Sequence, residues 1–279
     1  MSFGSSPLIL SINEFRILGD LIHERTGLYY DSGKRELLAE KLSPLAADRG
    51  FSSFLDFYYL LKYGPQADEA WACVIDALSV QETYFWREMN QIRAFVNELL
   101  PQYLAGNANQ PVRIWCAACA TGEEQLTIAM DLAEGGWFER SNIRIHASDA
   151  SSTALAKADR GIYRERSFRA LPPTLHEKYF TEGPSGWQVN ASLFSQITWS
   201  RANLVEAAEI KELVGAPFIF CRNVFIYFSE ETIARTIRHF AQGMARPGYL
   251  FVGAAESLLK LTDEFELTET GEAFVYVLK

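Results

Sequence analysis

The stretch from Pro111 to Glu124 constrains the fold of this 279-residue chain more than any other part of it. It reads Pro-Val-Arg-Ile-Trp-Cys-Ala-Ala-Cys-Ala-Thr-Gly-Glu-Glu, so a run suited to a buried strand passes through small residues into a helix. The small residues at positions 117–122 keep side-chain bulk away from the backbone, so a ligand can lie close against it. The sequence therefore predicts the first strand, tight turn and first helix of a nucleotide-binding α/β domain.

Two carboxylates at the start of this predicted helix, Glu123 and Glu124, indicate which ligand the turn accepts. Acidic side chains are favoured there by the helix dipole. They also occupy the place where a pyrophosphate would bind, and they would repel it. A neutral or cationic ligand fits better, and S-adenosylmethionine carries a positively charged sulfonium. Taken alone, the stretch is equally compatible with an ordinary β-α unit that has a small-residue turn.

A Cys-x-x-Cys pattern at Cys116 and Cys119 raises the alternative of a dithiol redox site. The cysteines fall partly within the predicted strand, whereas a redox pair opens the helix. Zinc is not supported either, because neither Cys73, Cys221 nor any of the four histidines forms a second closely spaced pair. We therefore expect small buried cysteines and no metal site.

Composition sets further bounds on the class of protein. With 48% hydrophobic and 13% aromatic residues, the chain can bury a sizeable core and is expected to hold two domains. The cysteine usage, the N-terminus and the lack of a long uncharged apolar run predict a reduced, cytoplasmic protein with no membrane insertion. A net charge of −9 argues against nonspecific nucleic-acid binding.

The N-terminal region, residues 1–80, reads as a helical domain. Apolar spacing predicts four helices, the last of which ends near Leu78. The cluster that follows, Gln81 to Glu88, places polar residues before three consecutive aromatics and an Arg-Glu pair. It precedes a predicted helix from Met89 to Leu104. We expect this cluster to fold across the cofactor cleft, to join two domains, or to do both.

Acidic and polar residues follow two later predicted strands. The strand Ile143–Asp149 ends in a carboxylate, which in nucleotide-binding sheets accepts hydrogen bonds from both ribose hydroxyls. The alternative is that Asp149 caps the next helix. The strand at 218–221 is followed by Arg222, Asn223 and Tyr227. Because ligands of open α/β sheets collect at the carboxyl ends of strands, we expect these side chains in one cleft.

Residues 161–198 break the α/β pattern. A short helix at 173–180 precedes a Gly-Pro turn at 183–186, and apolar residues then alternate up to Ile197. This predicts a small antiparallel β insertion in which Leu193, Phe194 and Ile197 take part. The sheet domain resumes at Trp199 and closes with a C-terminal hairpin.

Six motifs together resemble the CheR-type chemotaxis receptor methyltransferases, in order and over roughly residues 10–279. They are Gln81-Glu-Thr-Tyr-Phe-Trp-Arg-Glu, Trp115 with Thr-Gly-Glu-Glu124, Ala-Ser-Asp149, Gly161-Ile-Tyr163, Asn203-Leu204 and Cys-Arg-Asn-Val-Phe-Ile-Tyr-Phe228. The resemblance implies methyl esterification of glutamate side chains on the cytoplasmic helices of chemoreceptors. The donor would be S-adenosyl-L-methionine and the product S-adenosyl-L-homocysteine.

The resemblance also implies an architecture and a site. It implies an N-terminal helical domain over 1–80 and a Rossmann-like α/β methyltransferase domain over 81–279, with a β-subdomain at about 161–198. Arg87 and Tyr227 would lie nearest the transferred methyl and form the catalytic pair. The positions that would contact the cofactor are Gln81, Thr83, Arg87, Ala118, Glu124, Asp149, Asn203, Leu204, Arg222 and Asn223.

Some positions depart from the usual pattern of the family. Gln81 stands where Asn is common, Ala118 and Ala120 replace frequent Gly and Ser, and Gln125 replaces a frequent Pro. The second predicted helix lacks the basic run that receptor-docking relatives often carry, so we expect a different mode of receptor recognition. The β insertion looks short for gripping a receptor C-terminal pentapeptide. We expect a monomer that is independent of that peptide and serves chemotaxis or an alternative pathway such as surface or biofilm signalling.

Two other classes of function are alternatives to a receptor methyltransferase. A non-catalytic S-adenosylmethionine-binding signalling module would keep Asp149 yet tolerate the changes at Gln81 and Ala118. A small-molecule or nucleic-acid methyltransferase is less consistent with the acidic composition, and the sequence has no Asn-Pro-Pro-aromatic base-flipping motif.

Overall fold

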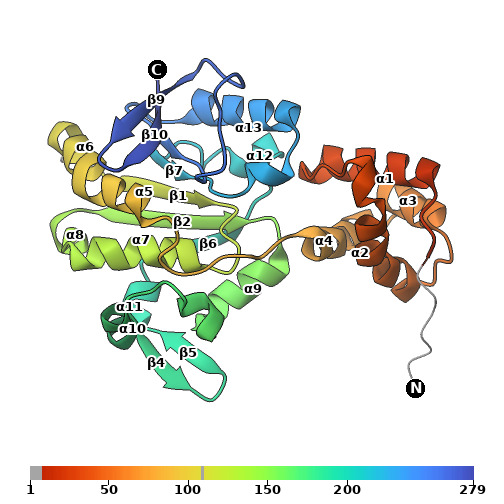
Figure 1. Ribbon diagram of the computed structural model, residues 1–279, viewed down its shortest axis with the longest axis horizontal. Coiled ribbons are helices and arrows are strands. Elements are labelled where there is room, and N and C mark those ends of the chain that lie inside the picture. Colours follow the sequence, from red (N-terminus) through yellow and green to blue (C-terminus); the bar gives the residue numbers. More distant parts are fainter. Residues whose placement is uncertain (1–7, 108–109) are drawn as a thin grey trace. The chain divides into compact units, whose positions relative to one another are not determined.

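The computed structural model describes residues 8–107 and 110–279 (Figure 1). The chain divides into two compact units. The first comprises residues 1–80 with 227–229, and the second comprises residues 81–226 with 230–279. In the described residues no helix combines the length and the apolar character that crossing a membrane requires.

The first unit is helical, as the apolar spacing predicts. Helix α1 begins with a capping box, in which Ser11 and Glu14 exchange hydrogen bonds, and it ends at Gly27 in the left-handed conformation (φ 79°). Phe54, Phe57 and several leucines are fully buried between the helices. The helices are α1 (Ile12–Thr26), η1 (Ser32–Lys34), α2 (Arg35–Asp48), α3 (Phe54–Tyr63) and α4 (Ala67–Leu78).

The second unit is built on a seven-stranded sheet with the order β6-β2-β1-β7-β8-β10-β9. The first five strands in this order are parallel, and the C-terminal hairpin adds two antiparallel strands. The order reverses beside β1, and ligands of open α/β sheets bind at such a switch point. The strands are β1 (Val112–Ala117), β2 (Ile143–Asp149), β6 (Ile197–Arg201), β7 (Phe218–Phe220), β8 (Tyr249–Phe251), β9 (Phe265–Thr270) and β10 (Ala273–Leu278).

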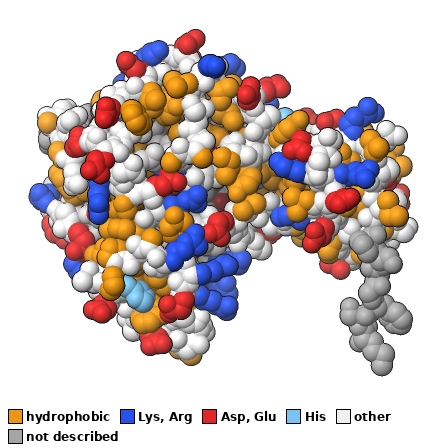
Figure 2. Space-filling view, viewed as in Figure 1, with side chains coloured by type: hydrophobic (Ala, Val, Ile, Leu, Met, Phe, Trp, Pro, Cys, Tyr) orange, Lys and Arg blue, Asp and Glu red, His pale blue; other side chains and the backbone are white. Residues whose placement is uncertain are grey.

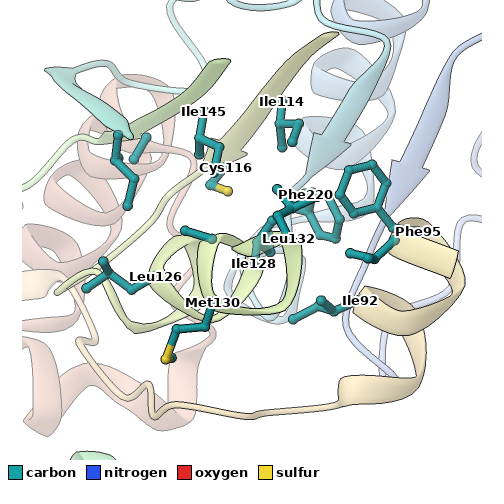
Figure 3. Packing of buried hydrophobic residues seen from close by; sticks show 14 of the residues in the cluster. Ile92, Phe95, Ile114, Cys116, Leu126, Ile128, Met130, Leu132, Ile145 and Phe220 are labelled. Atoms are coloured by element: carbon teal, nitrogen blue, oxygen red, sulfur yellow. The ribbon is translucent and has the colours of Figure 1, made fainter. Parts of the chain in front are cut away.

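Helices cover both faces of this sheet (Figure 1). Alternate residues of β1 point to opposite faces, as a strand requires. Ile114 and Cys116 point towards α7 (Glu123–Glu134), where they join one buried cluster (Figure 3). Trp115 contacts Phe240 of α13 (Glu230–Gly243) on the other face, with ring centroids 5.3 Å apart. The strand predicted from Val112, Ile114 and Trp115 is therefore buried on both sides.

The helical segment that leads into β1 runs from Met89 to Asn107 in three parts. These parts are α5 (Met89–Ala94), a π-helical turn (Phe95–Leu99) and α6 (Leu100–Asn107). The ring of Phe95 lies 4.8 Å from that of Phe218 and 5.5 Å from that of Phe220. Phe95 thereby ties this helical segment to β7, whose carboxyl end forms part of the site.

A second, three-stranded sheet has the order β3-β5-β4 and is antiparallel throughout. Its strands are β3 (Ile162–Tyr163), β4 (Phe180–Gly183) and β5 (Gly186–Val189). The small antiparallel insertion that the sequence predicts is therefore present. It follows α9 (Ser152–Arg160) and surrounds the helix α10 (Pro173–Tyr179).

The prediction that the β insertion includes Leu193, Phe194 and Ile197 is wrong. Leu193 and Phe194 lie in a short helix, α11 (Ala191–Phe194), and Ile197 begins β6 of the large sheet. The side chain of Asn190 accepts a hydrogen bond from the Ser192 amide and so starts the helix. This cap interrupts the apparent alternation, which the sequence pattern alone reads as one continuous strand.

Replacing Phe95 by Ala is expected to destabilise the second unit by about 3–5 kcal/mol, because a fully buried ring would leave a cavity among Phe218, Phe220 and Phe251. Urea unfolding followed by circular dichroism measures the change. Phe274 is 60% exposed, so Phe274→Ala is the matched control and should cost less than about 1 kcal/mol. Equal losses in the two variants would contradict the packing described here.

Candidate active site

The turn after β1 is held in an unusual backbone conformation. Ala118, Ala120 and Gly122 all have positive φ, at 54°, 48° and 106°. A Cβ at position 122 would lie 2.7 Å from the Tyr163 hydroxyl, so only glycine fits there. That hydroxyl donates to the carbonyl of Thr121 at 3.0 Å. The small residues of the sequence pattern therefore allow a tight turn at the carboxyl end of β1.

Asp149 lies at the carboxyl end of β2 and is 9% exposed. Its Oδ2 accepts a hydrogen bond from the Ala120 amide and its Oδ1 accepts one from the Ser151 amide, each at 2.8 Å. The cap of α9 is Ser151, whose hydroxyl accepts from the Ala154 amide. The alternative that Asp149 caps this helix is therefore wrong, and its carboxylate instead joins the ends of β1 and β2.

Arg222 follows β7 and is buried, with 1% of its side chain exposed. Its Nη2 lies 3.1 Å from Glu88 Oε2 and donates to the carbonyl of Arg87 at 2.9 Å. Its Nη1 lies 3.2 Å from Glu124 Oε2. One guanidinium thus joins the aromatic cluster after residue 81, the first turn of α7 and the end of β7. The Arg222 Nε is buried without a hydrogen-bond partner in the described structure.

The two carboxylates respond differently to Arg222. Burial raises the pKa of Glu124, and the positive charge of Arg222 only partly offsets this effect. Burial also acts to raise the pKa of Glu88, but the charge and hydrogen bond of Arg222, together with hydrogen bonds from the Ala254 amide and Asn223, lower this pKa. Arg222 thus contacts both carboxylates, and Glu88 Oε1 also lies 3.7 Å from Arg87 Nε.

Asn223 adopts the left-handed conformation, with φ 60°. Its backbone amide donates to Glu256 Oε2 at 2.8 Å. The same carboxyl group accepts from the backbone amides of Gly253 at 2.6 Å and Ile226 at 3.2 Å. A Cβ at Gly253 would collide with the Asn223 side chain. Glu256 therefore shapes the loop that carries Arg222 and Asn223.

Gln81 and Arg87 stand at the two ends of the aromatic cluster. Gln81 accepts from Lys157 Nζ at 2.7 Å, and its Nε2 lies 3.4 Å from the Ser151 hydroxyl. Gln81 is thereby brought to the start of α9, next to the segment that holds Asp149. Arg87 donates to the Glu82 carbonyl at 3.3 Å, and its side chain is 27% exposed. Thr83 lies between these two residues in the chain and is partly exposed.

The segment after β6 brings two more predicted residues to this edge of the sheet. The Ala202 amide donates to the Asp149 carbonyl at 3.1 Å, which aligns the ends of β6 and β2. Asn203 and Leu204 follow directly and are each 4% exposed. The Asn203 amide donates to Glu209 Oε2 at 2.9 Å.

Tyr227 is grouped with the first unit. It ends a 3-10 turn, η4 (Phe225–Tyr227), and its carbonyl accepts a hydrogen bond from the Tyr29 amide at 2.8 Å. Phe228 forms an isolated β-bridge with Leu28. Three residues of the chain therefore lie between Asn223, which belongs to the second unit, and Tyr227, which is grouped with the first.

The structure brings the predicted residues of the second unit into two linked groups. One contains Arg87, Glu124, Arg222 and Asn223, and the other contains Gln81 and Asp149, which meet through Ser151. The turn carrying Ala118 connects them. The sequence analysis did not assign roles to Glu88 or Glu256. The Arg-Glu pair at 87–88 was a signal for the first, whereas nothing local marks the second.

The four cysteines are free thiols in this structure. Cys116 and Cys119 are buried free thiols, and burial raises the pKa of each well above its ordinary value. A reactive thiol needs the opposite shift. Among residues 8–107 and 110–279, no group of three or more His, Cys, Asp and Glu side chains is placed to hold a metal ion.

A Rossmann-like sheet with carboxylates at its switch point suits S-adenosylmethionine, because negative charge favours the cationic groups of this cofactor. The fold and the site define a methyltransferase that uses this cofactor. The model of the CheR methyltransferase S-adenosylmethionine-binding domain matches residues 81–274, and that of the CheR methyltransferase all-alpha domain matches residues 13–79. The chain belongs to the CheR methyltransferase family.

Curated relatives are similar along nearly their whole length. Chemotaxis protein methyltransferase 2 of Vibrio cholerae is 30% identical, covering 94% of this chain and 91% of the relative. Chemotaxis protein methyltransferase 1 of Pseudomonas aeruginosa is 29% identical, covering 95% and 98%. The chemotaxis protein methyltransferase of Klebsiella aerogenes is 31% identical, covering 93% and 88%. The resemblance deduced from the six motifs is confirmed.

Replacing Arg222 by Met is expected to lower the free energy of unfolding at pH 7 by about 3–5 kcal/mol, because the partly buried carboxylates of Glu88 and Glu124 would lose the buried cation that both of them contact. Without Arg222 the folded-state pKa of both carboxyls rises, so the loss should shrink as the pH falls and they are protonated. Urea unfolding at pH 7 and pH 5 measures both effects.

The matched control for this variant is Arg201→Met. Arg201 forms a partly exposed pair with Glu209, at 3.4 Å, and such a pair contributes about 1 kcal/mol or less. If Arg222→Met cost no more than Arg201→Met, Arg222 would not be the organising cation of the site.

Proposed function

We propose that this chain methylates the side-chain carboxylates of glutamates on the cytoplasmic helices of chemoreceptors. The observation that carries the proposal is the partly exposed guanidinium of Arg87, next to an acidic cofactor site in a chain of the CheR family. Its relatives bear the name chemotaxis protein methyltransferase, which supports a chemosensory role. The proposed location is the cytoplasm, where such helices are found.

The residues present suit the cofactor. The carboxylate of Asp149 is fixed by two backbone amides, and a carboxylate offers about four acceptor positions, enough to receive ribose hydroxyls as well. Glu124, held in place by Arg222, suits a cationic group. Gln81, Thr83, Ala118, Asn203, Leu204, Arg222 and Asn223 complete the proposed cofactor contacts. When bound, S-adenosylmethionine supplies an electrophilic methyl group on its sulfonium.

The protein's part in the reaction is mainly alignment. A glutamate carboxylate has a reference pKa of ~4.3, so at neutral pH it is already an ionised nucleophile and needs no general base. Holding two reactants at attack distance contributes on the order of 7–11 kcal/mol. We propose that Arg87 pairs with the incoming carboxylate or with the carboxylate of the cofactor, and that the Tyr227 hydroxyl orients the incoming carboxylate. The present contacts of Arg87, to a carbonyl at 3.3 Å and to Glu88 at 3.7 Å, are weak enough to be exchanged.

The mode of receptor recognition is part of the proposal. Helix α2 carries Arg35 and Lys41 as its basic residues, against three acidic ones. The strands β4 and β5 have four residues each, so the sheet offers a short edge. We propose a monomer that acts independently of a receptor C-terminal pentapeptide, in chemotaxis or in a related surface-sensing pathway. Calorimetric detection of pentapeptide binding would refute that independence.

Methyl incorporation from labelled S-adenosylmethionine into receptor cytoplasmic fragments tests the function. The account predicts incorporation that alkali releases, because carboxyl methyl esters are hydrolysed by base. Alkali-stable label would point to a different acceptor group. Tight cofactor binding without any incorporation would favour the second candidate, a non-catalytic S-adenosylmethionine-binding signalling module.

Arg87→Ala is expected to lower turnover by about 10²–10⁴-fold while the circular dichroism spectrum stays unchanged, because the carboxylate would lose its positioning cation. Arg87→Lys keeps the charge but loses the planar fork, so it should recover only part of the rate. Normal turnover in Arg87→Ala would exclude Arg87 from catalysis.

Asp149→Asn is expected to weaken the binding of S-adenosylhomocysteine by about 10–100-fold. The asparagine side chain has one acceptor oxygen, and its NH2 group cannot replace the second carboxylate oxygen as an acceptor. Isothermal calorimetry measures the affinity directly. Asp159 is exposed on α9, so Asp159→Asn makes the same chemical change away from the site and should leave the affinity as it is. Unchanged binding by Asp149→Asn would rule out its ribose role.

A further inference from the structure

A short segment of the second unit has a net positive charge, opposite to that of the whole chain. Residues 157–169 contain five basic and two acidic residues, whereas the whole chain has a net charge of −9. The segment runs from the end of α9 through β3 to the turn η3 (Glu165–Phe168). Figure 2 shows Lys and Arg side chains gathered beside α9. The exposed basic residues are Lys157, Arg160, Arg164, Arg166 and Arg169.

Buried neighbours hold this segment in place. The Ser167 hydroxyl donates to Glu123 Oε1 at 2.9 Å, and the Ser167 carbonyl accepts from the Phe85 amide at 2.9 Å. The ring of Phe168 stacks on that of Phe85, with centroids 5.3 Å apart. The backbone that carries Arg166 and Arg169 is thereby anchored to the first turn of α7 and to the aromatic cluster.

The guanidinium of Arg169 lies close to that of Arg87, the catalytic candidate, because both stand over the ring of Tyr84. Arg169 lies 2.7 Å from Glu82 Oε1, and its guanidinium stands 3.7 Å above the ring of Tyr84. Arg87 stands over the same ring at 5.6 Å. A hydrogen bond from Arg169, together with the charges of Arg169, Arg166 and Arg87, lowers the pKa of Glu82. Three cations around one carboxylate leave a positive surface at the edge of the site.

Arg164 and Arg166 are exposed and make no side-chain hydrogen bond or ion pair within residues 8–107 and 110–279. An acidic partner can therefore approach them without displacing an internal one. We call Arg164, Arg166 and Arg169 the basic strip.

We propose that the basic strip docks the acidic face of the helix that bears the methyl-accepting glutamate. The inference rests on the proposed function and names the surface that recognises its substrate. Glutamates three or four residues apart lie about 5–6 Å from each other on one helix face, a spacing that a row of guanidiniums can follow. A chain with net charge −9 would otherwise repel such a helix.

The basic strip would also bind the substrate helix and the methylated product helix with different affinities. Esterification turns a carboxylate into a neutral ester, so each transferred methyl removes one charge that the strip attracts. The unmodified helix is therefore bound more tightly than the methylated one, which favours release of the product.

Binding of labelled peptides tests the proposal without requiring methyl transfer. The probe is a fluorescein-labelled synthetic helical peptide with glutamates at i, i+4 and i+7, and its counterpart has glutamine at these positions. In fluorescence anisotropy at 50 mM salt, the protein should bind the glutamate peptide more tightly than the glutamine peptide. Arg164→Gln with Arg166→Gln should weaken the glutamate peptide about tenfold and flatten its salt dependence.

The matched control is Arg144→Gln with Arg238→Gln, which changes the net charge equally. Arg144 lies near the amino end of β2 and Arg238 on α13, and both are exposed. The control should change peptide affinity by less than about twofold. S-adenosylhomocysteine titration should give the same affinity in both double variants, which confirms that the cofactor site is intact.

Three results would overturn the docking proposal. They are equal losses in the two double variants, equal affinity for the two peptides, and no binding of the glutamate peptide at 50 mM salt. Failure of the proposed function would give a different result. The protein would still bind the glutamate peptide, but no receptor fragment would acquire alkali-labile methyl groups.

Discussion

The site depends on one buried guanidinium. Arg222 bridges Glu88 and Glu124 and donates to the Arg87 carbonyl, so it connects three segments that are distant in sequence. A buried charge that loses its partner costs several kcal/mol, so none of the three can be placed without the others. The backbone at Arg87 and the start of α7 are therefore held by the same cation. Arg222 works as a positioning residue for the carboxylates as well as a proposed cofactor contact.

Two opposite electrostatic surfaces lie close together around this cation. Asp149, Glu88, Glu124 and Glu256 make the strand ends acidic, which suits a positively charged methyl donor. The basic strip, continued by Arg87, suits an acidic substrate helix. A carboxylate that accepts a methyl from a sulfonium needs both environments within one site, and the chain provides them in spite of its overall negative charge.

Sequence reasoning was strongest where local chemistry dictates the structure. The small-residue turn, the two glutamates that open α7 and the strand that ends at Asp149 all depend on neighbouring residues, and all were predicted. The burial of Arg222 was not predicted, because its partners lie 134 and 98 residues away in the chain. Glu256 was missed for the same reason. The end of the β insertion was misassigned because the Asn190 cap is a three-dimensional feature that alternation does not reveal.

Backbone hydrogen exchange with and without saturating S-adenosylhomocysteine tests the central claim, that the cofactor lies across the carboxyl ends of β1, β2, β6 and β7. The account predicts that added protection is concentrated in residues 118–124, 149–153, 203–205 and 222–224, together with the segment 81–88. Protection confined to other parts of the chain, or an unchanged exchange pattern in these segments under saturating ligand, would contradict it.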